Sequence, residues 1–365
     1  MLSVGIVGLP NVGKSSLFNA LTAAGAPAEN YPFCTVDPNI GTVEVPDPRL
    51  DRIHTLCGSP RRVPTVIQFV DIAGLVRGAS DGEGLGNQFL ANIRDVDAIA
   101  HVLRCFDDPD VAHVSGRVDP LRDRGIVETE LALADLDTVE RRLDKVEKKA
   151  RSGDEDARTE REALIRARDA LSRAVPLRRA ELTAEERAIL RRIQPLTEKP
   201  MLYVANIGED DLPDGRNEWT ARLAEAMHEE DAEEMVSVCS AMEAELAELD
   251  APERAEFLEA MGLRERGLDR FVRSAYHLLG LITFFTTGPK ESRAWTIRRG
   301  ARAPEAAGLI HSDFERGFIR AETIGYDEFI ELGSLKAARN QGRIRSEGKD
   351  YVVEDGDILL FRFNV

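Results

Sequence analysis

The sequence has 365 residues, of which 43% are hydrophobic and 31% charged, an ordinary composition for a globular protein with room for two or three domains. It has no apolar run near roughly 20 residues, no signal-peptide pattern and no CxxC pair among its four cysteines, so we expect a cytoplasmic, thiol-reduced protein rather than a membrane or secreted one. The net charge of −17 argues against binding to free DNA, since affinity for nucleic-acid phosphates is mostly electrostatic.

The first predicted element is a short buried strand over residues 2–7 that leads into a phosphate-binding motif. Residues 8–15 read Gly-Leu-Pro-Asn-Val-Gly-Lys-Ser, which is the spacing of a P-loop, and residues 16–21 begin a helix. Glycines at 8 and 13 let the backbone turn N–H groups toward phosphate oxygens, and the helix presents its positive end to them. A Gly-rich turn that matches by chance is the alternative, but the flanking strand and helix supply the context that the motif needs.

The P-loop assigns roles to several side chains. Lys14 is expected to act in catalysis by reaching the β- and γ-phosphates, and the Ser15 hydroxyl to ligate Mg²⁺. The sequence therefore predicts a nucleoside triphosphate with Mg²⁺ as the ligand. We expect the nucleotide contacts of this loop to come from Asn11, Val12, Gly13, Lys14, Ser15 and Ser16.

Two further segments fit the loops that sense the γ-phosphate in P-loop switch proteins. Thr35 lies about twenty residues past the P-loop, where a threonine completes the Mg²⁺ shell. Residues 66–71 form a predicted buried strand that ends in Asp71, a third candidate metal ligand that would hold Mg²⁺ through a water, and Gly74 follows with an N–H available to the γ-phosphate. A threonine in a turn and a strand that ends in aspartate by chance are the alternatives.

The residue after Gly74 is Leu75, where Ras-like GTPases have the glutamine that orients the attacking water. Leucine neither donates nor accepts a hydrogen bond, so another group must position that water. The Gly-rich residues 79–87 follow and are expected to be a switch segment, with an ordinary flexible loop as the alternative.

Residues 5–15, 30–35, 71–76 and 78–90 together resemble the YchF branch of the Obg-like translation-factor NTPases, and the resemblance continues to residues 355–357 and 361–365. It implies an ATPase that binds ribosomes, unlike its GTPase relatives. Residues 98–106 read as another central strand, and His113 lies in the loop beyond it. The resemblance implies that His113 is the partner of the hydrolytic water; from the sequence alone, a lone histidine is more often a surface or capping residue.

From residue 127 apolar positions recur at helical spacing between charged residues, and a turn near Gly153 separates two such stripes. This pattern predicts an antiparallel helical hairpin that projects from the nucleotide domain. Thr183 to Glu186 has capping-box spacing and is expected to start another helix. A charged hairpin is typically a structural arm, and we expect this one to contact a large partner.

Residues 200–205 are expected to form another strand of the predicted sheet. They are followed by Asn206-Ile207-Gly208-Glu209, at the position where GTPases have Asn-Lys-x-Asp. In those enzymes the aspartate accepts hydrogen bonds from guanine, and the longer Glu209 would misplace the carboxylate. The resemblance implies a preference for ATP over GTP, with Asn206 and the Ile207 backbone near the base. A GTPase with a degenerate motif remains the alternative.

From residue 281 short β-rich runs surround two brief helical stretches, a pattern that fits a small β-grasp module and resembles the TGS domain of the same family. This segment has 13 basic and 13 acidic residues, so the acidic excess lies in residues 1–280. Its cations could form a face for structured RNA, or simply a solvated surface. They are Lys290, Arg293, Arg298, Arg299, Arg302, Lys336, Arg339, Arg343 and Arg345.

The sequence therefore predicts an α/β P-loop NTPase G-domain (1–126 and 196–280) with an inserted antiparallel helical hairpin (127–195), followed by a β-grasp, TGS-like domain (281–365). The expected reaction is slow, Mg²⁺-dependent hydrolysis of ATP by a monomer that binds the ribosome or ribosomal RNA and switches partners with nucleotide state. The alternatives are an Obg-type GTPase in ribosome assembly and a nucleotide-gated binding module with incidental hydrolysis.

Overall fold

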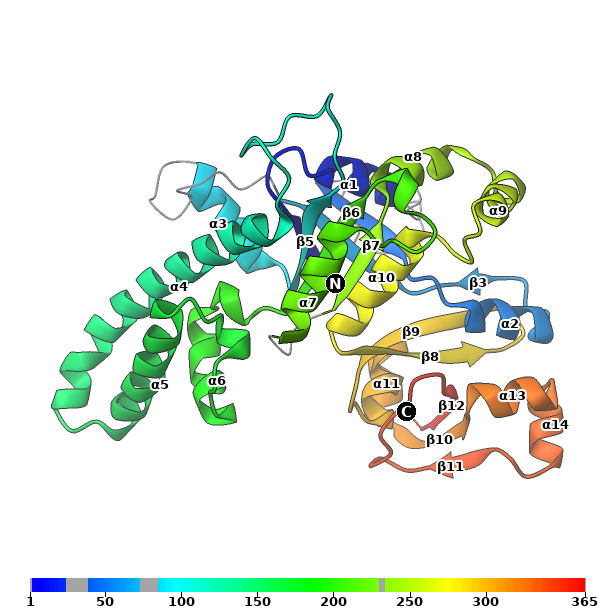
Figure 1. Cartoon of the computed structure of the whole chain (residues 1–365). Coiled ribbons are helices and arrows are strands. Elements are labelled where there is room, and N and C mark those ends of the chain that lie inside the picture. The colour runs from blue at the N-terminus through cyan, green and yellow to red at the C-terminus, as the bar shows by residue number, and fades with distance from the viewer. Residues whose placement is uncertain (1, 24–38, 73–84, 230–233, 365) are drawn as a thin grey trace. The chain divides into compact units, whose positions relative to one another are not determined.

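A computed structural model of the chain describes residues 2–23, 39–72, 85–229 and 234–364, which form two compact units, each with its own sheet (Figure 1). The first unit comprises Met1–Val43 and Gln68–Ala275, and the second comprises Glu44–Ile67 and Tyr276–Val365. Residues 44–67, expected within the nucleotide-binding domain, therefore belong to the second unit.

The first unit is built on a sheet with strand order β2-β4-β1-β5-β6-β7. The pairs β1–β4, β1–β5, β5–β6 and β6–β7 are parallel, and every residue of β5 and β6 is buried, as expected for the centre of a parallel sheet. The strands are β1 (Ser3–Val7), β2 (Ile40–Glu44), β4 (Val66–Asp71), β5 (Ala98–Cys105), β6 (Met201–Ile207) and β7 (Met235–Val238).

Helices of this unit connect the strands and continue past the last one. Thr183 and Glu186 form the predicted capping box at the start of α6. No helix in the described part of the chain is long and apolar enough to cross a membrane. The helices are α1 (Lys14–Ala23), α3 (Leu85–Asp95), α4 (Pro120–Arg151), α5 (Glu155–Ser172), α6 (Ala184–Leu190), α7 (Glu218–Glu229), α8 (Ser240–Glu248), α9 (Ala251–Ala260) and α10 (Gly267–Leu278).

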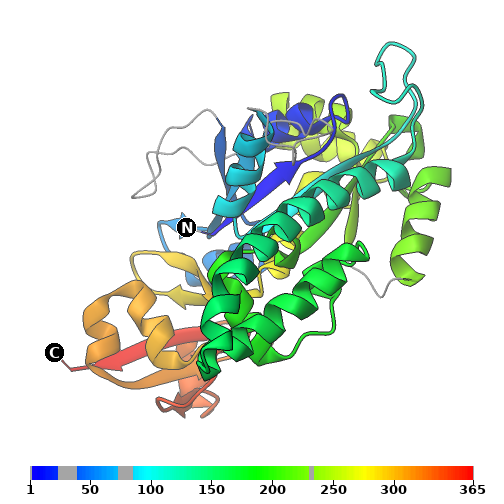
Figure 2. The same ribbon diagram turned by 90° about the vertical axis from the view of Figure 1, so that its left-hand side faces the viewer.

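Helices α4 and α5 lie side by side as a hairpin, which both views show (Figures 1 and 2). Their shared core is made of buried alanine, valine and leucine side chains, Val139 and Leu164 among them. Helix α4 begins at Pro120, before the expected start at 127, because the Asp119 carboxylate caps the backbone N–H of Arg122 and proline suits the first helical position.

The root of the hairpin is joined to the central sheet through Glu128 on α4. Its carboxylate accepts hydrogen bonds from the Tyr203 hydroxyl of β6 (2.6 Å) and from the guanidinium groups of Arg178 (2.8 Å) and Arg179 (3.1 Å). Charge-assisted hydrogen bonds of this kind are stronger than neutral ones. The hairpin is therefore held to β6, the strand that carries Asn206.

The second unit contains a mixed sheet with strand order β11-β10-β12-β8-β9-β3. Its central strands β8 and β12 are parallel, and their outer partners β9 and β10 are antiparallel to them, which is β-grasp topology. The strands are β3 (Arg62–Val63), β8 (Leu281–Thr287), β9 (Ser292–Arg298), β10 (Phe318–Ile324), β11 (Arg345–Glu347) and β12 (Ile358–Phe363).

Helices cover both faces of this sheet, so neighbouring residues of one strand enter different cores. Phe284 packs in the core that includes α11, whereas Phe285 packs in the core that includes α2, α13 and α14. From residue 281 on, two helical stretches were expected and the structure has four. Val352 makes only an isolated bridge, to Arg302. The helices are α2 (Pro48–Cys57), α11 (Ala303–Ile310), α12 (Ser312–Arg316), α13 (Tyr326–Leu332) and α14 (Leu335–Asn340).

Residues 44–67 join the second unit through long-range packing. Leu50 and Ile53 of α2 are buried in the same core as Phe285, and β3 pairs with β9. The Arg49 guanidinium also bonds the Asp355 carboxylate at 2.7 Å. Residues 44–67, which lie in the sequence between the candidate γ-phosphate sensors Thr35 and Gly74, thus belong to the second unit.

Candidate nucleotide-binding site

The P-loop joins β1 to α1 with backbone geometry that depends on two residues. Gly13 has φ +89° and Asn11 has φ +62°, both in the left-handed region. At Gly8 a Cβ would lie 2.8 Å from the carbonyl oxygen of Val102 on β5. Helix α1 then begins at Lys14, so its unpaired N–H groups and positive end face the loop.

Lys14 and Asp71, predicted independently from two motifs, form an ion pair between Nζ and Oδ1. Both side chains are largely buried, at 11% and 21% exposed. The pair brings the Lys14 ammonium of the P-loop to the carboxyl end of β4, of which Asp71 is the last residue. The Ser15 hydroxyl and the Asp71 carboxylate are hard oxygen donors, and Mg²⁺ uses one or two such protein ligands beside waters and phosphate oxygens, so the donor set fits this ion.

Asn206 connects the P-loop to the start of α8. Its Nδ2 donates to the carbonyl oxygen of Val12 (2.9 Å), and its Oδ1 accepts from the backbone N–H of Ser240 (3.0 Å). The side chain is 3% exposed and lies so close to Gly13 that a Cβ there would overlap Nδ2. The amide expected near the base therefore has a structural role in fixing the loop.

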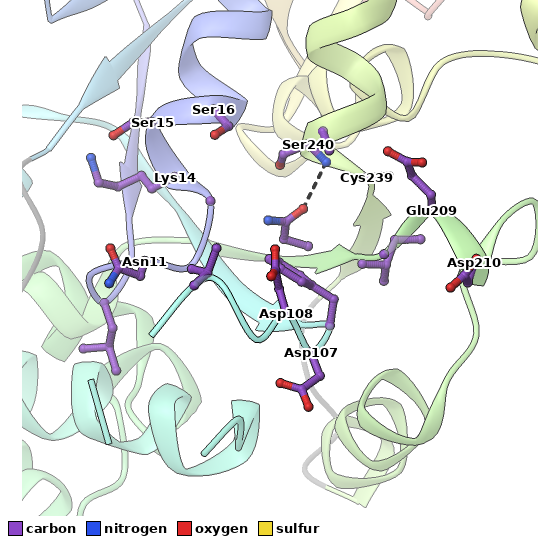
Figure 3. A pocket seen from close by; sticks show the side chains of 18 of the residues that line it. Asn11, Lys14, Ser15, Ser16, Asp107, Asp108, Glu209, Asp210, Cys239 and Ser240 are labelled. Atoms are coloured by element: carbon purple, nitrogen blue, oxygen red, sulfur yellow. Dashed lines mark hydrogen bonds between the residues drawn. The ribbon is translucent and has the colours of Figure 1, made fainter. Parts of the chain in front are cut away.

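A cavity of about 890 Å³ opens along the P-loop, within the size range of ligand sites (Figure 3). Lys14 and Ser15 lie at one end, and Glu209 and Asp210 at the other. Val12 does not line it, although its carbonyl is held by Asn206. The predicted site residues that line the cavity are Asn11, Gly13, Lys14, Ser15, Ser16, Asn206 and Ile207.

The end of the cavity away from Lys14 is rich in hydrogen-bond acceptors. Asp107, Asp108, Glu209 and Asp210 are among the residues that line the cavity. Cys239 also lines it, and burial raises the pKa of this thiol, which stays uncharged near neutral pH. This end is thus suited to a ligand that presents hydrogen-bond donors.

One wall of the cavity, the loop of residues 106–111, was not predicted from the sequence. Phe106, Asp107, Asp108, Pro109 and Val111 line the cavity from this loop, which follows β5. In the sequence they appeared only as a strand break. The loop continues to Ala112, whose carbonyl oxygen accepts a hydrogen bond from Asn11 Nδ2 (3.0 Å).

His113 lies just beyond this loop, with both ring nitrogens engaged. Nδ1 accepts from the backbone N–H of Ser115 (3.1 Å), so Nε2 carries a proton and donates to the Asp123 carboxylate (2.8 Å). The side chain is 3% exposed and does not line the cavity. In this arrangement neither ring nitrogen is available to a water molecule.

Four expectations fall outside the described residues, the last of them in part. They concern the metal ligand Thr35, the γ-phosphate contact Gly74, the residue after it, Leu75, and the switch segment of residues 79–87, of which 79–84 are not described.

Comparison with known proteins gives matches over the whole chain. Residues 281–364 match the family YchF-GTPase_C, described as a protein of unknown function (DUF933), and residues 3–128 match a family described as 50S ribosome-binding GTPase. A Bacillus subtilis (strain 168) protein named ribosome-binding ATPase YchF is 52% identical over 365 residues, with 100% of both chains covered. The Escherichia coli O157:H7 protein of the same name is 53% identical over 361 residues, 99% of each chain.

A solved structure described as the Schizosaccharomyces pombe YchF GTPase has a similar fold. It superimposes with a TM-score of 0.89 at 36% identity and covers 99% of this chain and 97% of that one. The names of these relatives differ in the nucleotide, ATP for the two bacterial proteins and GTP for the yeast one.

Proposed function

The chain belongs to the YchF family, and on this basis we propose that it is a Mg²⁺-dependent ATPase that binds the ribosome and changes its partner contacts with nucleotide state. The observation that carries the proposal is the ion pair of Asp71 with Lys14, which lines a cavity along the P-loop. That two residues assigned from separate motifs are in contact supports the assignment of both to one site.

The reaction would be ATP + H₂O → ADP + phosphate, by in-line attack of water on the γ-phosphorus. The Lys14 ammonium and the P-loop amides would stabilise the negative charge that develops on the phosphate oxygens. Ser15 and Asp71 would hold Mg²⁺, which supplies further charge neutralisation and orients the phosphates. With Leu75 after Gly74, turnover without a partner is expected to be slow.

The preference for ATP over GTP is supported by the names of the bacterial relatives and by the departure of residues 206–209 from the guanine-binding motif. The acceptors at the base end suit the amino group of adenine, whereas the aspartate that binds the N1–H and 2-amino group of guanine in GTPases is replaced here by the longer Glu209. Glu209 begins a short 3₁₀ helix (Glu209–Asp211) where GTPases have aspartate. A GTPase is the second candidate, because the S. pombe relative is named as one.

We expect GTP to displace labelled ATP at least about tenfold less effectively than unlabelled ATP does. The double substitution Ile207→Lys with Glu209→Asp restores the GTPase motif and should narrow this ratio. Glu225→Asp, the same shortening at an exposed position of α7, is the matched control. Equal displacement by GTP and ATP in the unmodified protein would contradict the assignment of ATP.

His113 remains the proposed partner of the hydrolytic water, a role that would require its ring to leave Asp123 or Ser115. We expect His113→Ala to lower the hydrolysis rate at saturating ATP by about a hundredfold, the lower end of what general-base groups contribute, after correction for the folded fraction. The correction matters because the substitution leaves the buried Asp123 carboxylate without this hydrogen-bond donor. An unchanged rate would exclude the role.

Ribosome binding is supported by the names of the bacterial relatives and by cations of the second unit. Within the described residues, four of the nine candidate cations are exposed and form no ion pair: Lys290, Arg298, Arg299 and Lys336. The other five pair with carboxylates, namely Arg293, Arg302, Arg339, Arg343 and Arg345.

We therefore expect Arg298→Glu with Arg299→Glu to weaken co-sedimentation with ribosomes by about tenfold or more at physiological salt. Arg316→Glu with Arg320→Glu is the matched control, since it makes the same charge change in the same unit at cations that already pair with carboxylates. The experiment is run with ADP, ATP and a non-hydrolysable ATP analogue. Binding that does not depend on the nucleotide would contradict the proposed switch.

A further inference from the structure

The loop of residues 106–111 is held in place by one buried side chain beneath it. Arg104 is on β5, in register with Asn206 on the neighbouring strand β6, and is 1% exposed. Its Nε donates to the carbonyl oxygen of Phe106 (3.1 Å), one terminal nitrogen to that of Val111 (2.9 Å) and the other to that of Asp108 (3.2 Å). One guanidinium therefore binds the first, third and last residues of the loop.

A buried charge needs compensation, because transfer out of water is costly. Among the described residues, Arg104 has no carboxylate partner, and its compensation comes from the three carbonyl dipoles and from the Phe106 ring, whose centroid lies 4.7 Å from the guanidinium carbon. The planar group presents donors in three fixed directions, which a lysine ammonium cannot reproduce at the same spacing. The position thus requires arginine for its geometry.

All three acceptor residues also line the nucleotide cavity. On the far side of the loop, Asn11 of the P-loop bonds the carbonyl oxygen of Ala112. The loop is therefore held by Arg104 along its length and by the P-loop at its end. Its position sets the distance between the phosphate end of the cavity and the opposite wall.

We propose that Arg104 is a positioning residue for nucleotide binding, which holds the 106–111 wall in place for the nucleoside. This inference rests on the proposed function, and it concerns the base end of the site rather than hydrolysis itself. Lys14, Ser15 and Asp71 belong to other elements, and the His113 ring has its own partners in Asp123 and Ser115. Loss of Arg104 should therefore weaken nucleotide affinity more than it slows the chemical step.

The test compares Arg104→Lys and Arg104→Gln in the full chain. Calorimetry with Mg·ATP gives the dissociation constant, and steady-state hydrolysis gives KM and kcat. We expect the dissociation constant and the KM for ATP each to rise about tenfold, while kcat changes by less than about threefold. The preference for ATP over GTP should also narrow. Arg187→Lys is the matched control, because Arg187 also donates to two backbone carbonyls, those of Leu177 and Ala180, but lies away from the cavity.

A folded Arg104 variant with the ATP affinity of the unmodified protein would overturn the proposal. A fall in kcat with KM unchanged would also overturn the proposal, because it indicates a smaller fraction of active molecules rather than weaker binding. If neither variant folds, Arg104 serves the fold as a whole and the specific role is wrong. An unmodified protein that binds ATP without hydrolysing it would contradict the proposed hydrolysis, and the effect of Arg104 would still be read from the dissociation constant.

Discussion

Lys14→Met is expected to lower ATP hydrolysis at least about a hundredfold, because it removes the ammonium that would neutralise charge developing on the phosphate oxygens. Lys14 pairs with Asp71, so the substitution also leaves that carboxylate, 21% exposed, without its cation. Since Asp71 retains access to water, the free energy of unfolding should change by no more than about 1 kcal/mol.

The measurement is phosphate release at saturating Mg·ATP, with urea unfolding as the check on folding. Lys148→Met, at an exposed position of α4, is the control and should hydrolyse ATP at the unmodified rate. Retention of more than a tenth of the rate by Lys14→Met would contradict the assignment of Lys14.

Gly13→Ala should abolish nucleotide binding by deforming the P-loop. A Cβ at this position would overlap Asn206 Nδ2, and φ +89° is unfavourable for alanine. Displacement of Asn206 would break its bonds to Val12 and Ser240, so we expect about 2–4 kcal/mol of destabilisation from strain and lost hydrogen bonds, together with at least about a hundredfold loss of ATP affinity.

Gly153→Ala is the control that separates the effect of backbone strain from the effect of steric overlap. Gly153 has φ +95°, but a Cβ there meets no described atom within 4 Å, and the residue lies in the turn of the hairpin. It should lose about 1 kcal/mol of stability through strain and bind ATP normally. Calorimetry and urea unfolding of the two variants measure the difference, and normal ATP binding by Gly13→Ala would contradict the geometry described for the loop.

The P-loop end of the cavity could be predicted because its parts are contiguous or adjacent in register. The strand before the P-loop, the helix after it and the strand that ends at Asp71 each follow from a local pattern, and the structure confirms all three. Parallel pairing of β1 with β4 then places Asp71 beside Ile6, two residues before the loop. Local rules therefore suffice for this half of the cavity.

The opposite wall could not be predicted, because backbone carbonyls make it. Every residue carries a carbonyl, so the sequence gives no sign of which three Arg104 will bind. The one available signal was an arginine within the otherwise apolar residues 98–106. Asn206 shows a related limit: its motif indicated a place near the base, but only the structure reveals that both ends of its amide are occupied by Val12 and Ser240.

The assignment of residues 44–67 to the second unit depends on contacts distant in sequence. Strand β3 has two residues, too few for a recognisable period, and its partner β9 begins at Ser292. The Ser59 and Ser292 hydroxyls, which bond at 2.8 Å, are 233 positions apart. Local periodicity carries no information about such pairs.

Calorimetric titration of the full chain with Mg·ATP tests the central claim most directly. The account predicts one ATP bound per chain, with GTP weaker by about tenfold or more and with binding abolished by Gly13→Ala. Absence of association with both Mg·ATP and Mg·GTP in a folded protein would contradict it.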